Sequence, residues 1–220
     1  MAKKTVRYED IPMEEHYDLV AEPQYDLFFN NGQNERQEEG TIRVLSLFSG
    51  CGGMDLGLEG GFVCHRKSVT DPLLVHAQIN DNWVLLERNM FRTVFACDIL
   101  EEARQTWLRY MSRYHVNPAI YHLESIVDLV KLQYGGNDVF PRNVDVVTGG
   151  FPCQDFSVAG KRKGFDSSVS HNGDKRIDDE PSEETRGKLY MWMKQVIDIV
   201  QPKMFIAENV KGLVSLGDVK

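Results

Sequence analysis

The sequence has no long apolar run, no closely spaced pair of cysteines and no excess of positive charge. No stretch approaches the roughly 18 apolar residues of a membrane-spanning helix, and residues 1–10 contain no apolar segment like that of a signal peptide. The four cysteines, Cys51, Cys64, Cys97 and Cys153, form no Cys-x-x-Cys pair, which argues against a zinc ribbon or a disulfide framework. We therefore expect a cytoplasmic protein with no membrane anchor and no metal.

Positive charge is scarce for a protein that would hold nucleic acid. The formal net charge is −8 over 220 residues, and residues 1–40 contain 4 Lys and Arg against 10 Asp and Glu. We interpret residues 1–40 as an acidic, flexible segment and residues 41–220 as a single domain. Residues 41–220 contain 21 basic and 23 acidic side chains, so this domain has no charge pattern able to hold a duplex alone.

One cysteine follows a short apolar run and a rigid turn. Residues 144–148 predict a buried strand, which continues into Gly-Gly-Phe-Pro-Cys-Gln-Asp-Phe-Ser at 149–157. The two glycines permit a sharp turn, and Pro152 restricts the backbone just before Cys153. A cysteine alone is more often a small buried apolar residue than a nucleophile. The turn nevertheless presents Cys153 at the carboxyl end of a strand, where ligands bind in open α/β sheets.

A second glycine-rich turn follows the first predicted strand, residues 42–48. Ser-Gly-Cys-Gly-Gly at 49–53 leads directly into the start of a helix, as in the first unit of a nucleotide-binding sheet. A tight connection without a ligand is the competing interpretation. We expect Cys51 to fill space within the turn.

Further strands are predicted at residues 93–98, 119–123 and 204–207, and a helix begins near residue 186. Asp98 ends the first of these strands, where a carboxylate either binds ribose hydroxyls or caps a helix beginning near Glu101. Glu208-Asn209-Val210 follows the last strand. Residues 64–90 are irregular and we interpret them as an insertion, and residues 166–184 as an expansion of a loop.

Three motifs in this order resemble those of the DNA (cytosine-5) methyltransferases: Phe48–Gly53, Pro152-Cys153-Gln154 and Glu208-Asn209-Val210. The resemblance covers residues 42–215. It implies an α/β fold with a Rossmann-like, mostly parallel sheet, present here in incomplete form. It also implies S-adenosylmethionine as cofactor, double-stranded DNA as substrate and a place in a restriction–modification system.

The resemblance implies a role for individual residues. Cys153 is expected to attack cytosine C6, and Glu208, with its pKa raised by burial, to contact N3. Cofactor contacts are expected from Phe48, Ser49, Gly50, Cys51, Gly52, Gly53, Asp98, Ile99, Ser125, Ile126, Pro152 and Leu189. DNA contacts are expected from Gln154, Ser157, Lys161, Arg162, Lys163 and Asn209. Ser125 stands where many relatives have an aspartate that binds adenine, so Glu124 or the Ile126 backbone are alternatives.

Parts that follow Glu-Asn-Val in the family are missing from this sequence: a Gln-x-Arg-x-Arg segment, a target-recognition domain and a final helix. We therefore expect residues 41–220 to form a partial catalytic domain. A second polypeptide would bind along the edge after Val210 and cover Leu213, Val214 and Leu216. Alternatives are a truncated, inactive member, a tRNA cytosine-5 methyltransferase relative, and a nucleotide-dependent oxidoreductase, against which Pro-Cys-Gln and Glu-Asn-Val argue.

Overall fold

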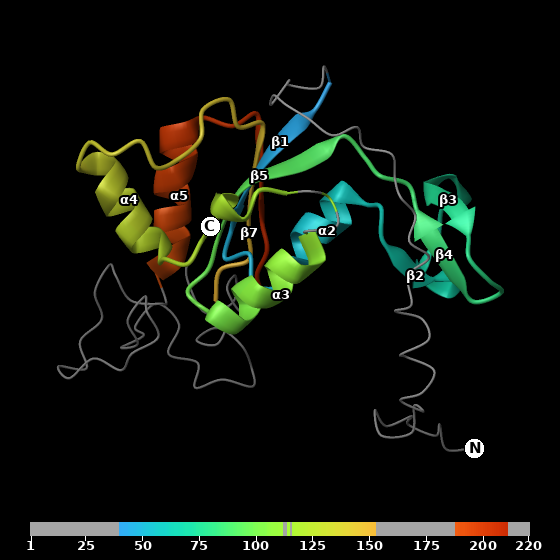
Figure 1. Cartoon of the computed structure of the whole chain (residues 1–220). Helices are drawn as coiled ribbons and strands as arrows, with labels where there is room; N and C mark the ends of the chain where they lie inside the picture. The colour runs from blue at the N-terminus through green and yellow to red at the C-terminus, as the bar shows by residue number, and fades with distance from the viewer. Residues whose placement is uncertain (1–39, 112–113, 115, 153–187, 211–220) are drawn as a thin grey trace. The chain divides into compact units, whose positions relative to one another are not determined.

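Five parallel strands form the central sheet of the computed structural model, which describes residues 40–111, 114, 116–152 and 188–210 (Figure 1). The strands are β1 (Ile42–Leu47), β5 (Phe91–Cys97), β6 (Tyr121–His122), β7 (Val146–Gly149) and β8 (Met204–Ala207). Their order across the sheet is β6-β5-β1-β7-β8, and every neighbouring pair is parallel. The predicted α/β fold with a parallel sheet is confirmed.

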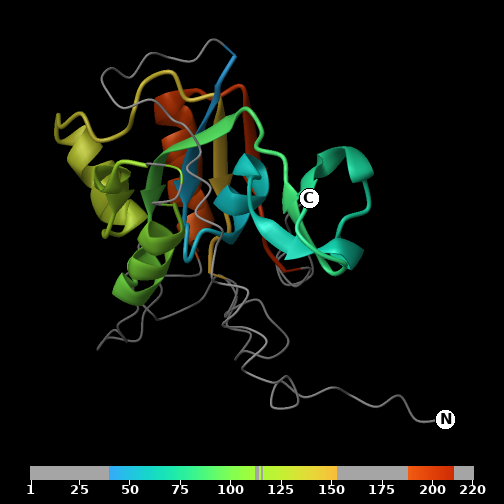
Figure 2. The same ribbon diagram turned by 45° about the vertical axis from the view of Figure 1, so that its right-hand side comes forward.

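Helices cover both faces of this sheet (Figures 1 and 2). On one face, α4 (Ile126–Tyr134) and α5 (Leu189–Val200) pack on the apolar side chains of β1, β5 and β7. On the other face lie α2 (Gly53–Glu59) and α3 (Glu101–Met111), and α3 packs on β5 and β6. The strands β1, β5 and β7 are therefore buried over most of their length on both faces, which explains why they are apolar runs rather than alternating patterns, whereas β8 is largely exposed.

The strand register brings the carboxyl ends of four strands into line. Leu47 is paired with both Cys97 and Gly149, and Gly149 is in turn paired with Ala207. After β1, the next two strands of this sheet, β5 and β6, are added on one side of β1, and the last two, β7 and β8, on the other side. The strand order therefore reverses between β1 and β7. Ligands of open α/β sheets bind at such a switch point.

Local features explain how α5 begins, packs and ends. Its inner stripe consists of Leu189, Met193 and Val196, which are all buried. A Cβ added at Gly149 would lie 2.9 Å from the Met193 sulfur, so glycine allows helix and strand to approach closely. The helix ends where Gln201 adopts a left-handed conformation with φ 47°, just before Pro202.

The insertion has regular structure, contrary to our expectation for residues 64–90. It forms an antiparallel sheet of β2 (Val63–His65), β4 (Trp83–Leu86) and β3 (Val75–Gln78), in the order β2-β4-β3. Asn80 makes the turn between β3 and β4, because its side-chain oxygen accepts hydrogen bonds from the backbone N–H groups of Asn82 and Trp83. The strands are only three or four residues long, too short to show a clear alternation in the sequence.

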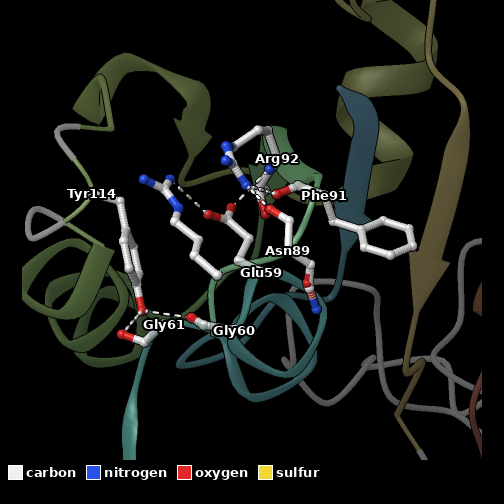
Figure 3. Close-up of polar contacts among 9 residues, drawn as sticks. Glu59, Gly60, Gly61, Asn89, Phe91, Arg92 and Tyr114 are labelled. Carbon is white, nitrogen blue, oxygen red and sulfur yellow. Dashed lines mark hydrogen bonds and ion pairs between the residues drawn. The ribbon is translucent and has the colours of Figure 1, made fainter. Parts of the chain in front are cut away.

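A buried carboxylate fixes this insertion to the central sheet (Figure 3). Glu59 is fully buried, accepts a hydrogen bond from the Thr93 backbone at 2.8 Å and pairs with Arg88 at 3.4 Å. Arg88 also lies 4.7 Å from the ring centre of Tyr114, whose hydroxyl donates to the Gly60 carbonyl. These contacts join the end of α2, the start of β5 and the chain after α3.

The strand predicted at residues 119–123 is shorter than expected. A 3-10 turn, η5 (Pro118–Ile120), occupies the first part, and β6 has only two residues. Pro118 has no N–H to donate to a ladder, and the Asn117 side chain accepts from the Ala119 backbone and so begins the turn. Our expectations for residues 1–39 and 166–184, and for Leu213, Val214 and Leu216, concern residues outside those described.

Candidate active site

The first glycine turn lies at the carboxyl end of β1 and is held from two sides. Phe48, Gly50 and Gly52 have φ angles of 52°, 52° and 89°, which turn the chain sharply into α2. The Gly50 N–H donates to Asp98 Oδ2 at 2.9 Å, and the Gly50 carbonyl accepts from the Tyr121 hydroxyl at 3.1 Å. The turn therefore has a fixed shape that depends on β5 and β6.

The Ser49 side chain is hydrogen-bonded within the protein. Its hydroxyl lies 3.0 Å from both the carbonyl and the hydroxyl oxygen of Ser46, to which it can donate, and it accepts from the Cys97 backbone N–H at 3.1 Å. The Ser49 backbone N–H in turn donates to the Cys97 carbonyl at 2.9 Å. Ser49 thus continues the hydrogen bonding between the end of β1 and the end of β5, and this contact holds the first glycine turn in place.

Asp98 accepts hydrogen bonds at the start of α3, as the helix-cap interpretation predicted, and also from the first glycine turn. Oδ1 accepts from the backbone N–H groups of Ile99 and Leu100, at 2.7 and 3.1 Å, immediately before α3. Oδ2 accepts from Gly50 in the first glycine turn. A carboxylate can accept about four hydrogen bonds, so three backbone donors leave capacity for a ligand hydroxyl. The neighbouring Ile99 side chain is exposed beside it.

Two aromatic side chains lie beneath the turn. A Cβ added at Gly52 would lie 2.6 Å from Cδ1 of Trp107, so the indole ring is in contact with the Gly52 backbone. Trp107 meets Tyr121 edge to face at 5.2 Å between ring centres. Burial raises the pKa of Tyr121, which keeps its hydroxyl protonated as the donor to Gly50.

We expect Gly52→Ala to be strongly destabilising. The new methyl group would overlap the Trp107 ring, and alanine disfavours a φ angle of 89°. Together these effects should lower the free energy of unfolding by about 2–4 kcal/mol. Urea unfolding measures this change. Gly53→Ala is the matched control, since a Cβ there meets nothing within 4 Å and φ is not positive. Equal unfolding midpoints for the two variants would contradict the close contact.

The end of β6 presents a different residue from the one favoured by the sequence. Ser125 is buried and its hydroxyl accepts from the Val127 backbone at 3.3 Å, so it caps α4. Ile126 is buried in the core with α4. Glu124 is exposed and lies 3.6 Å from Nδ1 of His122, a ring that stacks on Phe95. Of the three alternatives, Glu124 has the side chain most accessible from solvent.

The second glycine turn lies at the ends of β7 and β8. The Glu208 backbone N–H donates to the Gly149 carbonyl at 2.9 Å, and a Cβ added at Gly150 would lie 3.3 Å from Glu208 Oε2. The Asn209 amide donates to the Phe151 carbonyl at 2.8 Å. Asn209 and Glu208 therefore both contact the chain immediately before Pro152.

The two glycine turns also contact one another through aromatic rings. Phe48, which ends the β1 segment, meets Phe151 edge to face at 6.5 Å between ring centres. Phe151 is buried, and it also lies 6.3 Å from Tyr190 at the start of α5. The first glycine turn and the chain up to Phe151 are thus packed against one another.

Several expectations from the sequence need correction. Cys51 is exposed at the top of the turn and fills no interior space. Leu189, like Ile126, lies in the apolar core, because it belongs to the inner stripe of α5. Glu208, expected to be buried, is exposed. Asn209 uses both side-chain atoms within the chain, since Oδ1 accepts from the Val210 backbone at 2.8 Å.

The remaining expected residues lie outside those that the structure describes: Cys153, Gln154, Ser157, Lys161, Arg162 and Lys163. Pro152 is described and is half-buried after Phe151. Within the described ranges there is no group of three or more side chains suited to bind a metal ion. None of the described helices is long and apolar enough to cross a membrane.

The parallel sheet is doubly wound, with glycine turns after β1 and β7 and an acidic residue at the end of β5. This arrangement is typical of the class of α/β proteins that bind nucleotide-like ligands at the switch point of the sheet. The chain belongs to the C-5 cytosine-specific DNA methylase family, whose model matches residues 42–218.

Three bacterial type II methyltransferases are similar to this chain. M.BsuRI of Bacillus subtilis is 33% identical over 179 residues, and M.BspRI of Lysinibacillus sphaericus is 35% identical over 177 residues. M.Sau96I of Staphylococcus aureus is 37% identical over 183 residues. Each match covers 80% of this chain but only 33%, 34% and 29% of the respective relative. The chain thus spans about a third of the length of these relatives.

Proposed function

We propose that this chain is the catalytic part of a DNA (cytosine-5) methyltransferase in a restriction–modification system. It would transfer the methyl group of S-adenosylmethionine to C5 of a cytosine in double-stranded DNA. The observation that carries the proposal is the alignment of two glycine turns, Asp98 and Glu208 at one edge of the sheet. The first glycine turn and Glu208 belong to segments that resemble motifs of this family, whose model matches residues 42–218.

The first glycine turn, Phe48–Gly53, is called the cofactor turn from here on. The residues around it fit a nucleoside cofactor. The backbone of Gly50 and Gly53 is open, because a Cβ at either position meets nothing within 4 Å. Asp98 retains acceptor capacity for ribose hydroxyls, and exposed Ile99 offers an apolar surface to a base. Glu124 would accept from the adenine amino group. When bound, S-adenosylmethionine supplies an electrophilic methyl group on a sulfonium.

Cys153 and Glu208 would prepare the cytosine ring for methylation. C5 of cytosine is a poor nucleophile, and addition of the Cys153 thiolate to C6 makes it enamine-like. Protonation or strong hydrogen bonding at N3 by Glu208 takes up the charge that develops during this addition. After C5 is methylated, loss of the C5 proton and elimination of the thiolate restore the aromatic ring and free Cys153.

The exposure of Glu208 is consistent with a site that the substrate itself completes. Neither face of C6 can be reached in a stacked duplex, so the cytosine must leave the helix. A base bound between Cys153 and Glu208 would displace water from the carboxyl group, and desolvation favours its protonated form. Asn209 would keep the chain before Cys153 in place through its hydrogen bond to the Phe151 carbonyl.

We further infer that another polypeptide segment covers β8. Among the described residues, β8 has a hydrogen-bonded neighbour, β7, on one side only. Its Met204 and Phe205 side chains are 50% and 56% exposed. Large apolar side chains on an open strand edge are unfavourable in water and promote association. A segment carrying the target-recognition function would cover them and supply DNA affinity that the near-neutral domain lacks.

Transfer of radioactive methyl groups to a DNA duplex tests the proposal. We expect the chain alone to bind S-adenosylmethionine weakly and to transfer little. A second polypeptide carrying the Gln-x-Arg-x-Arg segment and a target domain should restore transfer to cytosine C5. Sequence-specific methylation at an ordinary rate by the chain alone would contradict the need for a second segment. Absence of any transfer by the combined proteins would contradict the proposed activity.

A further inference from the structure

The buried face of α2 carries two acidic side chains, Asp55 and Glu59, in place of the usual apolar residues. Glu59 is paired with Arg88, as described above. Asp55 is also fully buried, but its partner is neutral: Oδ2 accepts a hydrogen bond from the indole Nε1–H of Trp107 at 2.6 Å. Nothing in the proposed reaction uses this carboxyl group.

The Asp55–Trp107 hydrogen bond acts on the ring that supports the cofactor turn. Trp107 is fully buried, and the five-membered part of its indole contacts Gly52, where an added Cβ would lie 3.1 Å from Nε1 itself. The atom to which Asp55 is hydrogen-bonded therefore lies close beside the turn, in the space that a side chain at position 52 would need. Tyr121, packed against Trp107, holds Gly50 from the same side.

We propose that Asp55 is a positioning residue for the cofactor turn. It holds the Trp107 ring against Gly52, and the ring in turn fixes the backbone that would receive S-adenosylmethionine. The proposal rests on the proposed function for the identity of the cofactor. The contacts of Trp107 with Asp55 and with the turn at Gly52 do not depend on which cofactor binds.

A contribution to the stability of the fold does not by itself explain why position 55 is an aspartate. An apolar side chain at position 55 would fill the same space without the cost of placing a carboxyl group in the interior. A carboxylate, however, forms a stronger and more directional hydrogen bond to an indole N–H than a neutral acceptor does. The hydrogen bond from Trp107 to Asp55 therefore fixes the orientation of the indole ring. A fixed ring is useful to the protein if the ring in turn fixes the position of the Gly52 backbone.

The protonation state of Asp55 provides a way to test this coupling. Burial raises the pKa of Asp55 to about 6, while hydrogen bonds from Ser46 and Trp107 lower it and the charge of Glu59 raises it. The other titratable groups that act on this site are Cys97 from β5 and Tyr121 from β6. Burial raises the pKa of both, so both stay neutral between pH 5 and 8.

The sign of the expected effect follows from this pKa. Above about pH 6 Asp55 is ionised and the charge-assisted bond to Trp107 is present. As the pH falls through 6, protonation weakens the bond and frees the ring. The position of Gly52, and with it cofactor affinity, should therefore change near pH 6.

Two-dimensional NMR of the isolated chain tests the coupling without cofactor. We expect the Trp107 indole N–H and the Gly52 amide to shift together, with one midpoint near pH 6. Asp55→Asn retains an oxygen acceptor but cannot titrate, so both shifts should disappear. Asp71→Asn is the matched control, because Asp71 is an exposed cap of a 3-10 turn. A Gly52 amide that does not titrate in the wild type, or that titrates equally in Asp55→Asn, would overturn the proposal.

Calorimetry with S-adenosylmethionine adds a second readout. The wild-type dissociation constant should rise about fivefold between pH 7.5 and pH 5, and Asp55→Asn should show the higher value throughout. Trp107→Phe removes the donor and should also abolish the pH dependence, whereas Trp83→Phe in the inserted sheet should not. Wild-type affinity that is independent of pH overturns the coupling to binding. Failure of the wild type to bind at any pH counts against the proposed function, while the NMR shifts still decide the role of Asp55.

Discussion

Cys153→Ser should abolish methyl transfer and leave cofactor binding unchanged. A serine hydroxyl is largely protonated at neutral pH and adds poorly to C6, whereas a cysteine forms its thiolate readily. Loss of a catalytic nucleophile typically lowers turnover by many orders of magnitude, and we expect at least about 10⁴-fold here. The measurement is a single-turnover methyl-transfer assay under conditions in which the wild type is active, with calorimetry for the cofactor.

A duplex containing 5-fluorocytosine identifies the nucleophile directly. Fluorine cannot leave C5 as a proton does, so the thiolate adduct persists and the protein stays attached to DNA. Peptide mapping should locate the attachment at Cys153. Cys64→Ser is the matched control, because Cys64 lies in the inserted sheet away from both glycine turns, and it should be trapped normally. Attachment at Cys51, Cys64 or Cys97 would refute the assignment.

Glu208→Gln should reduce turnover by roughly 10²- to 10³-fold, the usual contribution of a general acid. The amide is nearly the same size, so the backbone hydrogen bond from Glu208 to Gly149 and the contact with Gly150 should persist. It cannot deliver a proton to N3. Cofactor affinity should stay within about twofold, since Glu208 lies at the end of β8 and the cofactor turn follows β1.

The rate of trapping by 5-fluorocytosine distinguishes the role of Glu208 from that of Cys153. Glu208→Gln should still form the adduct, but slowly, because addition at C6 would lack its acid. Glu102→Gln on the exposed side of α3 is the control for the same change of charge. Turnover of Glu208→Gln equal to that of Glu102→Gln would show that Glu208 has no part in the chemistry.

Much of the fold was predictable from residue patterns because its strands are short runs rich in apolar residues. The runs at 42–48, 93–98 and 204–207 became β1, β5 and β8 with ends shifted by at most two residues. The small sheet of the insertion was not predictable in this way. Its strands β2 and β3 have three and four residues, and both pair with β4, which follows β3 through the Asn80 turn.

The motifs predicted a site, but they did not predict which contacts each residue makes in the folded chain. Asp98 had two interpretations, and its carboxylate makes hydrogen bonds to both the turn and the start of α3. Ser125 stood at the expected adenine position, yet its hydroxyl caps α4. A short polar side chain bonds to whichever backbone N–H lies nearest, and that distance is a property of the folded chain.

The linear sequence was sufficient for the order of the motifs, the parallel sheet and the placement of Asp98 and Glu208 at strand ends, because these depend on neighbouring residues and on short apolar runs. It gave no sign that Asp55 and Trp107, 52 positions apart, share a hydrogen bond beneath Gly52. Aspartate after a glycine turn suggests a helix start, and tryptophan in a helix suggests the core. Their contact arises only when α2 and α3 pack on the same face of the sheet, since the partner of a buried polar group is chosen by packing rather than by position in the chain.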